Sequence, residues 1–544
     1  MARARALRTF VSTIALAAAC AACARAPGHG GAPPAGRTTV RFAIAADPQS
    51  LNPLFAHVDA NSVEQQVARL AFEPFIDIDE RGNPVPVLLD RVPTLANGGV
   101  SRDARTITYH LRRGVRWQDG VPVTARDVVW TLRAILDDRN PVRSRAGYEK
   151  VARADALDDR TVRVTLKEPW APAVATLFSY GTAPQFVLPA HLLEHEPNLE
   201  RSAFAAHPVG NGPFRFVEWS RGDHLVYEAN PGYWRGVPKL ARIHIRVVPD
   251  PGTNFTLLQS GGLDWNLMSP AQRASLGKPA QLDFRTVPLT LVAGIAINTT
   301  HPPLDDVRVR RAIAASIDRG GIARKITFGR YPVVDGAQPL GSWARDPSVH
   351  EPPYDPAAAD RLLDGAGWTR GRDGVRVKDG KPLELTYVQF PESATGVRVA
   401  TVVESELGAR GFRIAIKSLS NAQLFLPKSQ GGTLATGAFD MAYVPWPMGA
   451  DPDDSFLLTC RGAANVMRWC SGDVDRLEAN AVVEPSRAER KRLYSLIERR
   501  VAENVPIVFL FNPSYSYAYR TNLHGFSPNA FNPTWNAYRW SLSP

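Results

Sequence analysis

Cysteine is scarce in this sequence, with four residues among 544. Two of them, Cys20 and Cys23, lie near the start of the chain, which leaves only Cys460 and Cys470 for the remainder. No His or further Cys stands beside this second pair to complete a set of metal ligands. In an oxidising compartment, the ten-residue spacing therefore favours a local disulfide over a metal site.

Acidic residues are absent from the first 37 positions, whereas five arginines are present there. Without this segment the chain has 59 basic and 53 acidic residues, so its formal net charge falls from +11 to +6. No long run of Lys or Arg follows. Because a nucleic-acid-binding surface needs basic side chains clustered on one face, we predict a mildly basic surface and no nucleic-acid partner.

Apolar runs long enough to cross a bilayer, about 20 residues, are also absent. The run over residues 10–19 is shorter, follows three arginines and is rich in small residues, which is typical of a secretory signal. Small residues precede both Cys20 and Cys23, as in the lipobox of bacterial lipoproteins, although neither cysteine has a large aliphatic residue three positions earlier.

We therefore predict a signal peptide of lipoprotein type over residues 1–23, with lipid attached to one of these two cysteines. Ordinary cleavage after Ala24 or Ala26 is the alternative. Residues 24–37, rich in Gly and Pro, would form a flexible tether. The mature protein is then expected in the periplasm or, on its lipid anchor, at the outer face of the cytoplasmic membrane.

Common catalytic motifs are missing: the sequence contains no G-x-S-x-G, Walker or G-x-G-x-x-G pattern. The clearest enzymatic signal is an H-x-x-E-H pattern, in which His191 and His195 would bind zinc and Glu194 would act as the base. Three fixed positions arise easily by chance, and Pro189 favours a short surface helix here instead. We predict no enzyme, metal or cofactor, and keep a secreted zinc hydrolase as an alternative.

Apolar residues at every second position indicate half-buried strands. Such runs cover residues 40–44, 107–111, 162–166 and 243–247. Helix-start signals are interleaved with them, at residues 124–127, 355–356 and 486–489. The mixture predicts an α/β protein. Because single cores stop growing at about 250–300 residues, this length predicts two or three lobes.

Several segments, taken in order, resemble the family 5 extracytoplasmic solute-binding proteins, which serve ABC importers for peptides, nickel and related ligands. The resemblance extends over residues 38–544. Its segments are 47–55 (DPQSLNPLF), 111–129 (LRRGVRWQDGVPVTARDVV), 208–216 (PVGNGPFRF), 230–236 (NPGYWRG), 303–313 (PLDDVRVRRAI), 317–319 (IDR) and 451–453 (DPD). The stretch from Pro189 to Glu194 also resembles a common family segment, which weakens the zinc interpretation.

The resemblance implies a two-lobed periplasmic-binding-protein (Venus-flytrap) fold of type II, cluster C, with an extra subdomain in lobe 1. The expected divisions are lobe 1 over 38–286 with an inserted subdomain at about 76–205, a hinge crossing at 287–298, lobe 2 over 299–506, a second crossing at 507–515, and a return to lobe 1 over 516–544.

The implied function is the capture of a small peptide or similar solute by lobe closure, followed by delivery to a membrane permease. The ligand would favour the closed form and so drive the motion. The expected partners are the ABC permease and its ATPase, and the protein is expected to be a monomer. A non-peptide ligand of the same fold, such as a nickel chelate, an opine or an oligosaccharide, is the alternative.

In peptide-binding relatives, a tryptophan precedes by three residues an aspartate that pairs with the ligand's α-ammonium group. Here Trp446 is kept, but Gly449 occupies the position of the aspartate. A buried ammonium without a carboxylate is costly. Either Asp451 or Asp453 therefore takes this role through a shifted loop, or the ligand is not an ordinary free-amine peptide.

The remaining ligand-binding residues expected in the cleft are Asn298, Trp446, Met448, Tyr148 and Phe511. The resemblance also bears on the second cysteine pair, because some dipeptide-binding relatives carry two cysteines after the same Asp-Pro segment. It implies that Cys460 and Cys470 are bonded.

Overall fold

The computed structural model describes residues 38–55, 62–180 and 184–543. The predicted signal peptide, the two candidate lipidation sites Cys20 and Cys23, and the tether lie outside the described residues. Among the described residues, no helix is both long enough and apolar enough to cross a membrane. Both lobes described below belong to one compact unit, residues 37–544.

Lobe 1 is built on a four-stranded sheet in the order β1-β9-β8-β7. β1 pairs in parallel with β9, and the other neighbours are antiparallel. Along β1, Val40, Phe42 and Ile44 are buried while the residues between them are half-buried, as the alternating pattern predicts. The strands are β1 (Thr39–Ile44), β7 (Phe214–Ser220), β8 (His224–Ala229) and β9 (Arg242–Val247).

A second sheet of lobe 1, in the order β4-β6-β5, is antiparallel and packs against helix α2 (Ala125–Leu136). Thr124 and Asp127 form the predicted capping box at the start of this helix. The other oxygen of Asp127 accepts a hydrogen bond from the backbone of Ala190, which fastens a later segment to the same helix end. The strands are β4 (Thr106–His110), β5 (Val151–Asp158) and β6 (Thr161–Leu166).

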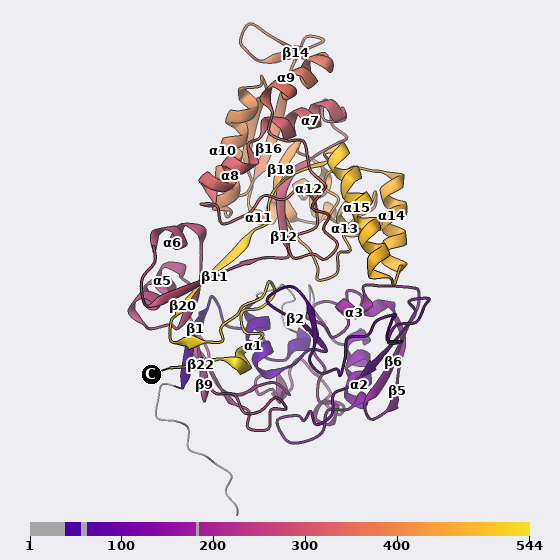
Figure 1. Cartoon of the computed structure of the whole chain (residues 1–544), viewed down its shortest axis with the longest axis vertical. Helices are drawn as coiled ribbons and strands as arrows, with labels where there is room; N and C mark the ends of the chain where they lie inside the picture. The colour runs from indigo at the N-terminus through magenta and orange to yellow at the C-terminus, as the bar shows by residue number, and fades with distance from the viewer. Residues whose placement is uncertain (1–37, 56–61, 181–183, 544) are drawn as a thin grey trace, which may run out of the picture. The chain divides into compact units, whose positions relative to one another are not determined.

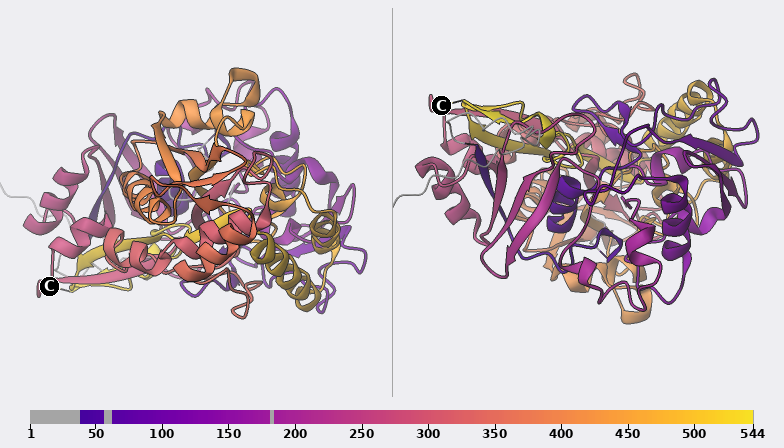
Figure 2. Two further views of the ribbon diagram at one scale, coloured as in Figure 1. Left: turned by 90° about the horizontal axis from the view of Figure 1, so that it is seen from above. Right: turned by 90° about the horizontal axis from the view of Figure 1, so that it is seen from below.

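Lobe 2 contains a five-stranded sheet in the order β17-β16-β18-β12-β19. Its strands are β12 (Leu291–Ile297), β16 (Glu384–Gln389), β17 (Arg413–Ser418), β18 (Met441–Pro447) and β19 (Ile507–Phe511). Helices lie around this sheet (Figure 2), so its central strands are apolar on both faces. These helices are α7 (Val307–Ser316), α8 (Arg319–Ile326), α9 (Pro356–Gly365), α10 (Ala394–Gly408), α14 (Gly472–Val483) and α15 (Arg487–Asn504).

Shorter elements complete both lobes. Those of lobe 1 are α1 (Val63–Ala71), β2 (Ile76–Ile78), β3 (Pro84–Pro86), α3 (Ala173–Thr176), α4 (Ala190–Leu193), α5 (Pro251–Ser260), α6 (Pro270–Ser275), β21 (Leu523–His524) and β22 (Ser541–Leu542). Those of lobe 2 are β13 (Thr369–Arg370), β14 (Arg376–Lys378), β15 (Lys381–Pro382), α11 (Asn421–Phe425), α12 (Thr433–Thr436) and α13 (Ser455–Leu458).

Two short connections join the lobes. β20 (Ser514–Arg520) pairs with both β11 (Leu282–Pro288) and β10 (Trp265–Met268) on the lobe 1 side, whereas β12 and β19 pair within the lobe 2 sheet (Figure 1). The connections are therefore residues 289–290 and 512–513, shorter than the ranges expected from the sequence. The buried amide of Asn512 ties them together, because it donates to the carbonyls of Leu289 (2.8 Å) and Leu291 (2.7 Å).

Each lobe has its own hydrophobic core. One core takes side chains from Val40 to Val287 and again from Tyr517 to Trp540, and the other takes side chains from Val292 to Phe511. The C-terminal segment is held in lobe 1 by polar contacts as well, since the Asn532 amide donates to the Gln65 carbonyl of α1. The lobe 1 core thus includes side chains from the C-terminal segment, and the chain returns to lobe 1 to complete this core.

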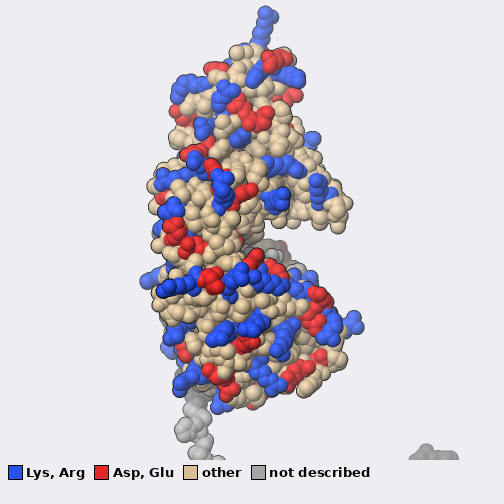
Figure 3. Space-filling view, turned by 90° about the vertical axis from the view of Figure 1, so that its right-hand side faces the viewer, with Lys and Arg blue, Asp and Glu red and all other residues tan. Residues whose placement is uncertain are grey.

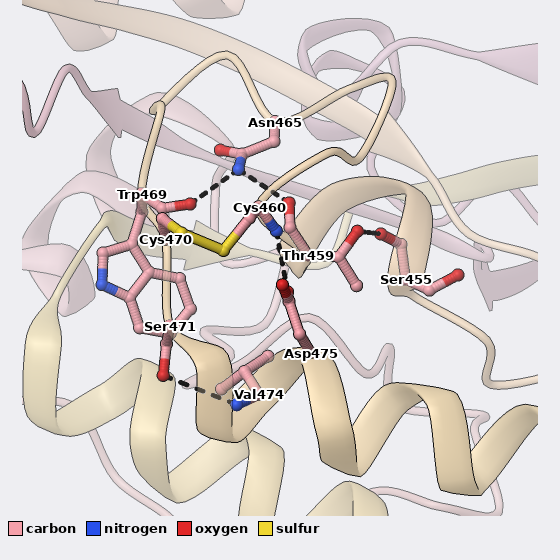
Figure 4. Close-up of a disulfide and its surroundings, with 9 residues drawn as sticks. All are labelled: Ser455, Thr459, Cys460, Asn465, Trp469, Cys470, Ser471, Val474 and Asp475. Carbon is pink, nitrogen blue, oxygen red and sulfur yellow. Dashed lines mark hydrogen bonds between the residues drawn. A yellow bond between two sulfur atoms is a disulfide. The ribbon is translucent and has the colours of Figure 1, made fainter.

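The cysteines of lobe 2 are joined in a disulfide between α13 and α14 (Figure 4). The backbone amide of Cys460 donates to the Asp475 carboxylate at 2.9 Å. The Asn465 amide donates to the carbonyls of Thr459 (2.8 Å) and Trp469 (2.7 Å), so the loop inside the disulfide is hydrogen-bonded to its own ends. These bonds fix the approach to α14.

We expect replacement of Cys460 and Cys470 by alanine to lower the free energy of unfolding by about 2–3 kcal/mol, because the short closed loop restricts the unfolded chain. Urea denaturation of the parent and the double variant measures this difference. As a control, a reducing agent should destabilise the parent and leave the variant unchanged. Equal stability of parent and variant would contradict the expectation.

Candidate functional site

Three neighbouring cavities of about 490, 400 and 210 Å³ lie between the lobes. All three are lined by Ala450, which follows β18, and we call the combined space the cleft. The space-filling view shows a hollow between the lobes (Figure 3). Lobe 1 contributes the β2–β3 hairpin and the α3 region, and lobe 2 contributes residues 339–343, 447–453 and 485–490. Volumes of this size suit small-molecule ligands.

The first cavity, the largest of these three, has a mainly apolar wall from lobe 1. The lobe 2 wall differs, because Trp343, Asp451, Arg487 and Arg490 line it. The apolar side chains of the lobe 1 wall include Ile76, Ile78, Val92, Leu95, Val100 and Val174.

Asp451 and Arg490 form a two-bonded ion pair in this wall, with nitrogen–oxygen distances of 2.7 and 2.5 Å. Arg490 also donates to the carbonyl of Ala481 at the end of α14 and to the Tyr494 hydroxyl. Burial lowers the pKa of Arg490, but the facing Asp451 carboxylate outweighs it, and the net shift is upward. The charge of Asp451 is thus already compensated before any ligand enters.

Asp453 lines the second cavity and has no cationic partner within 4 Å in the part of the chain that the structure describes. Its carboxylate accepts a hydrogen bond from the backbone of Ser455 at 3.1 Å, and the Ser455 side chain is also a partner. Burial, followed by the nearby Asp451, raises its pKa. Trp170 and Phe456 line the same cavity. An ammonium group would find there both an unpaired carboxyl and aromatic surface.

Gly147 shapes the second cavity from lobe 1. Its backbone adopts φ 84°, a conformation that favours glycine. A Cβ atom at this position would lie 2.3 Å from the Trp170 ring, so a side chain here would displace the ring from the cavity wall.

Arg487, the first residue of α15, stands at the first cavity with its side chain exposed. Its guanidinium carbon lies 4.8 Å from the centre of the Trp343 ring, which is a cation–π contact. Among the described residues, no carboxylate lies within 4 Å of it. The first cavity therefore carries one uncompensated positive charge.

The third cavity lies beside the lobe connections, between the β2–β3 turn and residues 339–343. Charged residues of this turn, Asp79, Glu80 and Arg81, line it together with Leu289 of the first connection. The oxygens of Asp79 are occupied within the turn, because Oδ1 accepts from the backbone amides of Arg81 and Asn83 and Oδ2 accepts from the side-chain amide of Asn83. This end of the cleft is thus the one closest to the hinge.

The family model for bacterial extracellular solute-binding proteins, family 5 Middle, matches residues 90–467. The chain belongs to this family. Protein XP55 of Streptomyces lividans is 32% identical over 394 residues, 70% of this chain and 67% of that protein. The Di/tripeptide-binding protein 2 of Pseudomonas aeruginosa is 28% identical over 465 residues, 80% and 84% of the two chains. This family 5 protein is thus a solute-binding protein that works outside the cytoplasm, as its sequence motifs predict.

A solved structure supports the same fold for this family 5 protein. NikZ from Campylobacter jejuni, in complex with Ni(L-His), superposes with a TM-score of 0.73 at 24% identity, over 93% of this chain and 100% of that chain. The two-lobed α/β fold predicted from the sequence is confirmed.

Five residues expected to contact the ligand lie in the hydrophobic cores or in buried hydrogen bonds, and none lines the three cavities. Trp446, Met448 and Phe511 pack in the lobe 2 core. Tyr148 packs in the lobe 1 core, where its hydroxyl accepts from the backbone of Phe178 at 2.8 Å. Asn298 is fully buried and donates to the carbonyls of Gly437 and Phe439, both at 3.1 Å. The structure thus places these five side chains in packing and buried hydrogen bonds, and their contact with a ligand stays a prediction.

The side chains of the alternative zinc motif do not converge on one point. His191 lies 2.7 Å from Asp119, Glu194 pairs with Arg126, and His195 is exposed. Of the three motif residues only His191 lies in α4, which has four residues and ends at Leu193. Within the ranges that the structure describes, no group of three or more His, Cys, Asp or Glu side chains is arranged to hold a metal ion.

Sequence reasoning missed three residues of the lobe 2 wall: Trp343, Arg487 and Arg490. The capping pattern at 486–489 correctly places the start of α15, so Arg487 is visible as its first residue. Nothing in the sequence indicates that this helix end faces a cavity. The ion pair of Arg490 with Asp451 links positions 39 residues apart, and no local pattern marks it.

A buried carboxyl pair supports the loop that carries Asp451 and Asp453. Asp454 and Glu478 are both fully buried, and burial raises the pKa of Asp454 to about 6 and that of Glu478 well above its usual value. Two carboxyl groups in contact form a hydrogen bond only if one keeps its proton. Gln338 completes the support by donating to Asp454 and to the carbonyl of Pro452, both at 2.8 Å.

We expect the free energy of unfolding to fall as pH rises from 5 to 8, because the folded protein holds the shared proton of Asp454 and Glu478 more tightly than the unfolded chain does. The variant Glu478→Gln should show a shallower decline, since its amide donates to Asp454 at every pH. The effect is about 1.4 kcal/mol for each unit of pKa shift removed. Urea denaturation at pH 5.5 and 8.0 measures it.

The exposed Glu404→Gln on α10 serves as the control and should follow the parent at both pH values. A decline in Glu478→Gln as steep as that of the parent would show that the pair holds no proton.

Proposed function

We propose that this family 5 protein captures a short peptide with a free α-ammonium group in the cleft and delivers it to an ABC permease and its ATPase. The observation that carries the proposal is the unpaired carboxyl of Asp453 in the second cavity, beside Trp170 and Phe456. Of the two candidate aspartates, Asp451 is already neutralised by Arg490. Asp453 is therefore the residue that takes the place of the aspartate replaced by Gly449.

Electrostatics supports this assignment. The raised pKa of Asp453 means that burial disfavours its charged form. A ligand ammonium next to it would restore the favourable charge, lower this pKa and satisfy the carboxylate with a charge-assisted hydrogen bond. The similarity to the Di/tripeptide-binding protein 2 of Pseudomonas aeruginosa agrees with a peptide ligand.

The lobe arrangement supplies the mechanism of capture. A ligand in the second cavity would contact Trp170 and Ser179 from lobe 1 and Asp453 and Phe456 from lobe 2. Contacts to both lobes stabilise the closed form over the open one, and every 1.4 kcal/mol of difference shifts the balance about tenfold. Rotation would concentrate at the connections bridged by Asn512, since both are only two residues long.

We also propose that the protein acts as a monomer without chemical change to its cargo, in the periplasm or on a lipid anchor at the outer face of the membrane. The permease would distinguish loaded from empty protein by the closure of the lobes.

A thermal-shift screen against di- to pentapeptides, opines and Ni(L-His) tests the ligand class, because a ligand of the folded state raises the melting temperature by mass action. We expect free-amine peptides to raise it and the radius of gyration in solution scattering to decrease on binding. A shift with Ni(L-His) or an opine and none with any peptide would overturn the peptide assignment.

Asp453→Asn should weaken the binding of a free-amine peptide by about tenfold to a hundredfold, since it removes one charge-assisted hydrogen bond. The binding of the N-acetylated peptide, already weaker, should change little. Isothermal titration calorimetry measures both affinities. Asp473→Asn, an exposed site on α14 outside the cleft, is the matched control. Unchanged affinity in Asp453→Asn would exclude Asp453 as the ammonium partner.

A further inference from the structure

The first cavity has features that play no part in the proposed binding of the ammonium group by Asp453 in the second cavity. It is the largest of the three, its lobe 1 wall is apolar, and the exposed cation Arg487 lies on its lobe 2 wall. The other arginine there, Arg490, is satisfied by Asp451. The cavity can therefore take an apolar group together with one negative charge.

The contact of Arg487 with Trp343 leaves its positive charge uncompensated by any carboxylate among the described residues. Its guanidinium stacks over Trp343 at 4.8 Å, which orients the planar group while its N–H donors stay free. Among the residues described, it makes no ion pair, whereas Arg492 and Arg476 on the same helical pair are each bonded to a neighbouring carboxylate. A planar guanidinium with free donors suits a carboxylate, which it binds with two parallel hydrogen bonds.

The first and second cavities are direct neighbours, because Ala175, Ser179, Ala450 and Asp451 line both. The second cavity has the unpaired carboxyl of Asp453, and the first has the unpaired guanidinium of Arg487. Asp451 lines both cavities, and its ion pair with Arg490 contributes no net charge. A molecule with an ammonium at one end and a carboxylate at the other matches this order of charges.

We propose that the first cavity is the subsite for the carboxyl-terminal residue of the cargo, with Arg487 binding the free carboxylate and the apolar wall taking an apolar side chain. The substrate class is then short peptides that end in an apolar residue with an unblocked carboxyl group. The proposal rests on the function proposed above and adds to it the direction of the peptide and the character of its last residue.

Another arginine in the cleft, Arg81, could also bind the ligand's carboxylate. It lines the third cavity from the β2–β3 turn. It differs from Arg487 because its surroundings include the carboxyl groups of Asp79 and Glu80, and because the third cavity is the smallest. An experiment must therefore compare the two arginines directly.

The experiment is calorimetric titration of the full chain with three ligands: Ala-Ala-Leu, its carboxyl-terminal amide, and Ala-Ala-Gln. For the parent, we expect the amide to bind about tenfold or more weakly than the acid, because it loses a charge-assisted contact. Ala-Ala-Gln should also bind more weakly, since its polar side chain would be buried against an apolar wall without a partner.

Arg487→Gln should bind the acid and the amide alike, at the affinity of the amide, and Arg487→Lys should restore part of the preference for the acid. Lys491→Gln, an exposed cation one turn further along α15, should keep the full preference. Leu95→Ser, at a partly exposed position of the apolar wall, should reduce the preference for Leu over Gln at the carboxyl terminus.

The possible failures are distinguishable. If peptides bind but the parent does not prefer acid over amide, or if Arg81→Gln rather than Arg487→Gln abolishes the preference, this inference is overturned and the peptide function stands. If none of the three ligands or any longer peptide binds, the proposed function falls and this inference falls with it.

Discussion

The ion pair between Asp451 and Arg490 is the interaction on which the architecture of the cleft depends. It joins the loop after β18 to α15, two segments far apart in the sequence, and so fixes the lobe 2 wall. Both side chains are nearly buried, and removal of either partner would leave an uncompensated charge, which is strongly destabilising. The pair also determines the electrostatics of the site, since Asp453 and Arg487 remain the uncompensated charges of the first two cavities.

The lobe 2 wall is supported by many contacts, whereas the connections between the lobes are short. Behind the wall, Asp454, Glu478 and Gln338 form a buried polar network, and the disulfide braces the approach to α14. Between the lobes, only two dipeptide connections cross, bridged by the Asn512 amide. In the proposed capture by closure, rotation would concentrate in the connections while the binding surfaces move as units.

The secondary structure was largely predictable because its signals are local. The alternation of Val40, Phe42 and Ile44 gives the strand β1, and the capping patterns before α2 and α15 place both helix starts. Large apolar and aromatic residues behave differently, because a tryptophan in a core and a tryptophan in a cleft have the same sequence signature. Trp446 and Tyr148 were expected in the cleft and lie in the cores, whereas Trp343 lines the cleft without any preceding signal.

By itself, the sequence determined the α/β class, the succession of strands and helices, and the family to which the chain belongs, because periodicity, caps and motifs each depend on neighbouring residues. The tertiary structure alone decided which charged groups remain unpaired. Asp451 and Asp453 stand two positions apart with the same side chain, and only the approach of Arg490 from a distant helix neutralises one and leaves the other facing the cavity. Charge compensation depends on distances in space, and local sequence does not encode them.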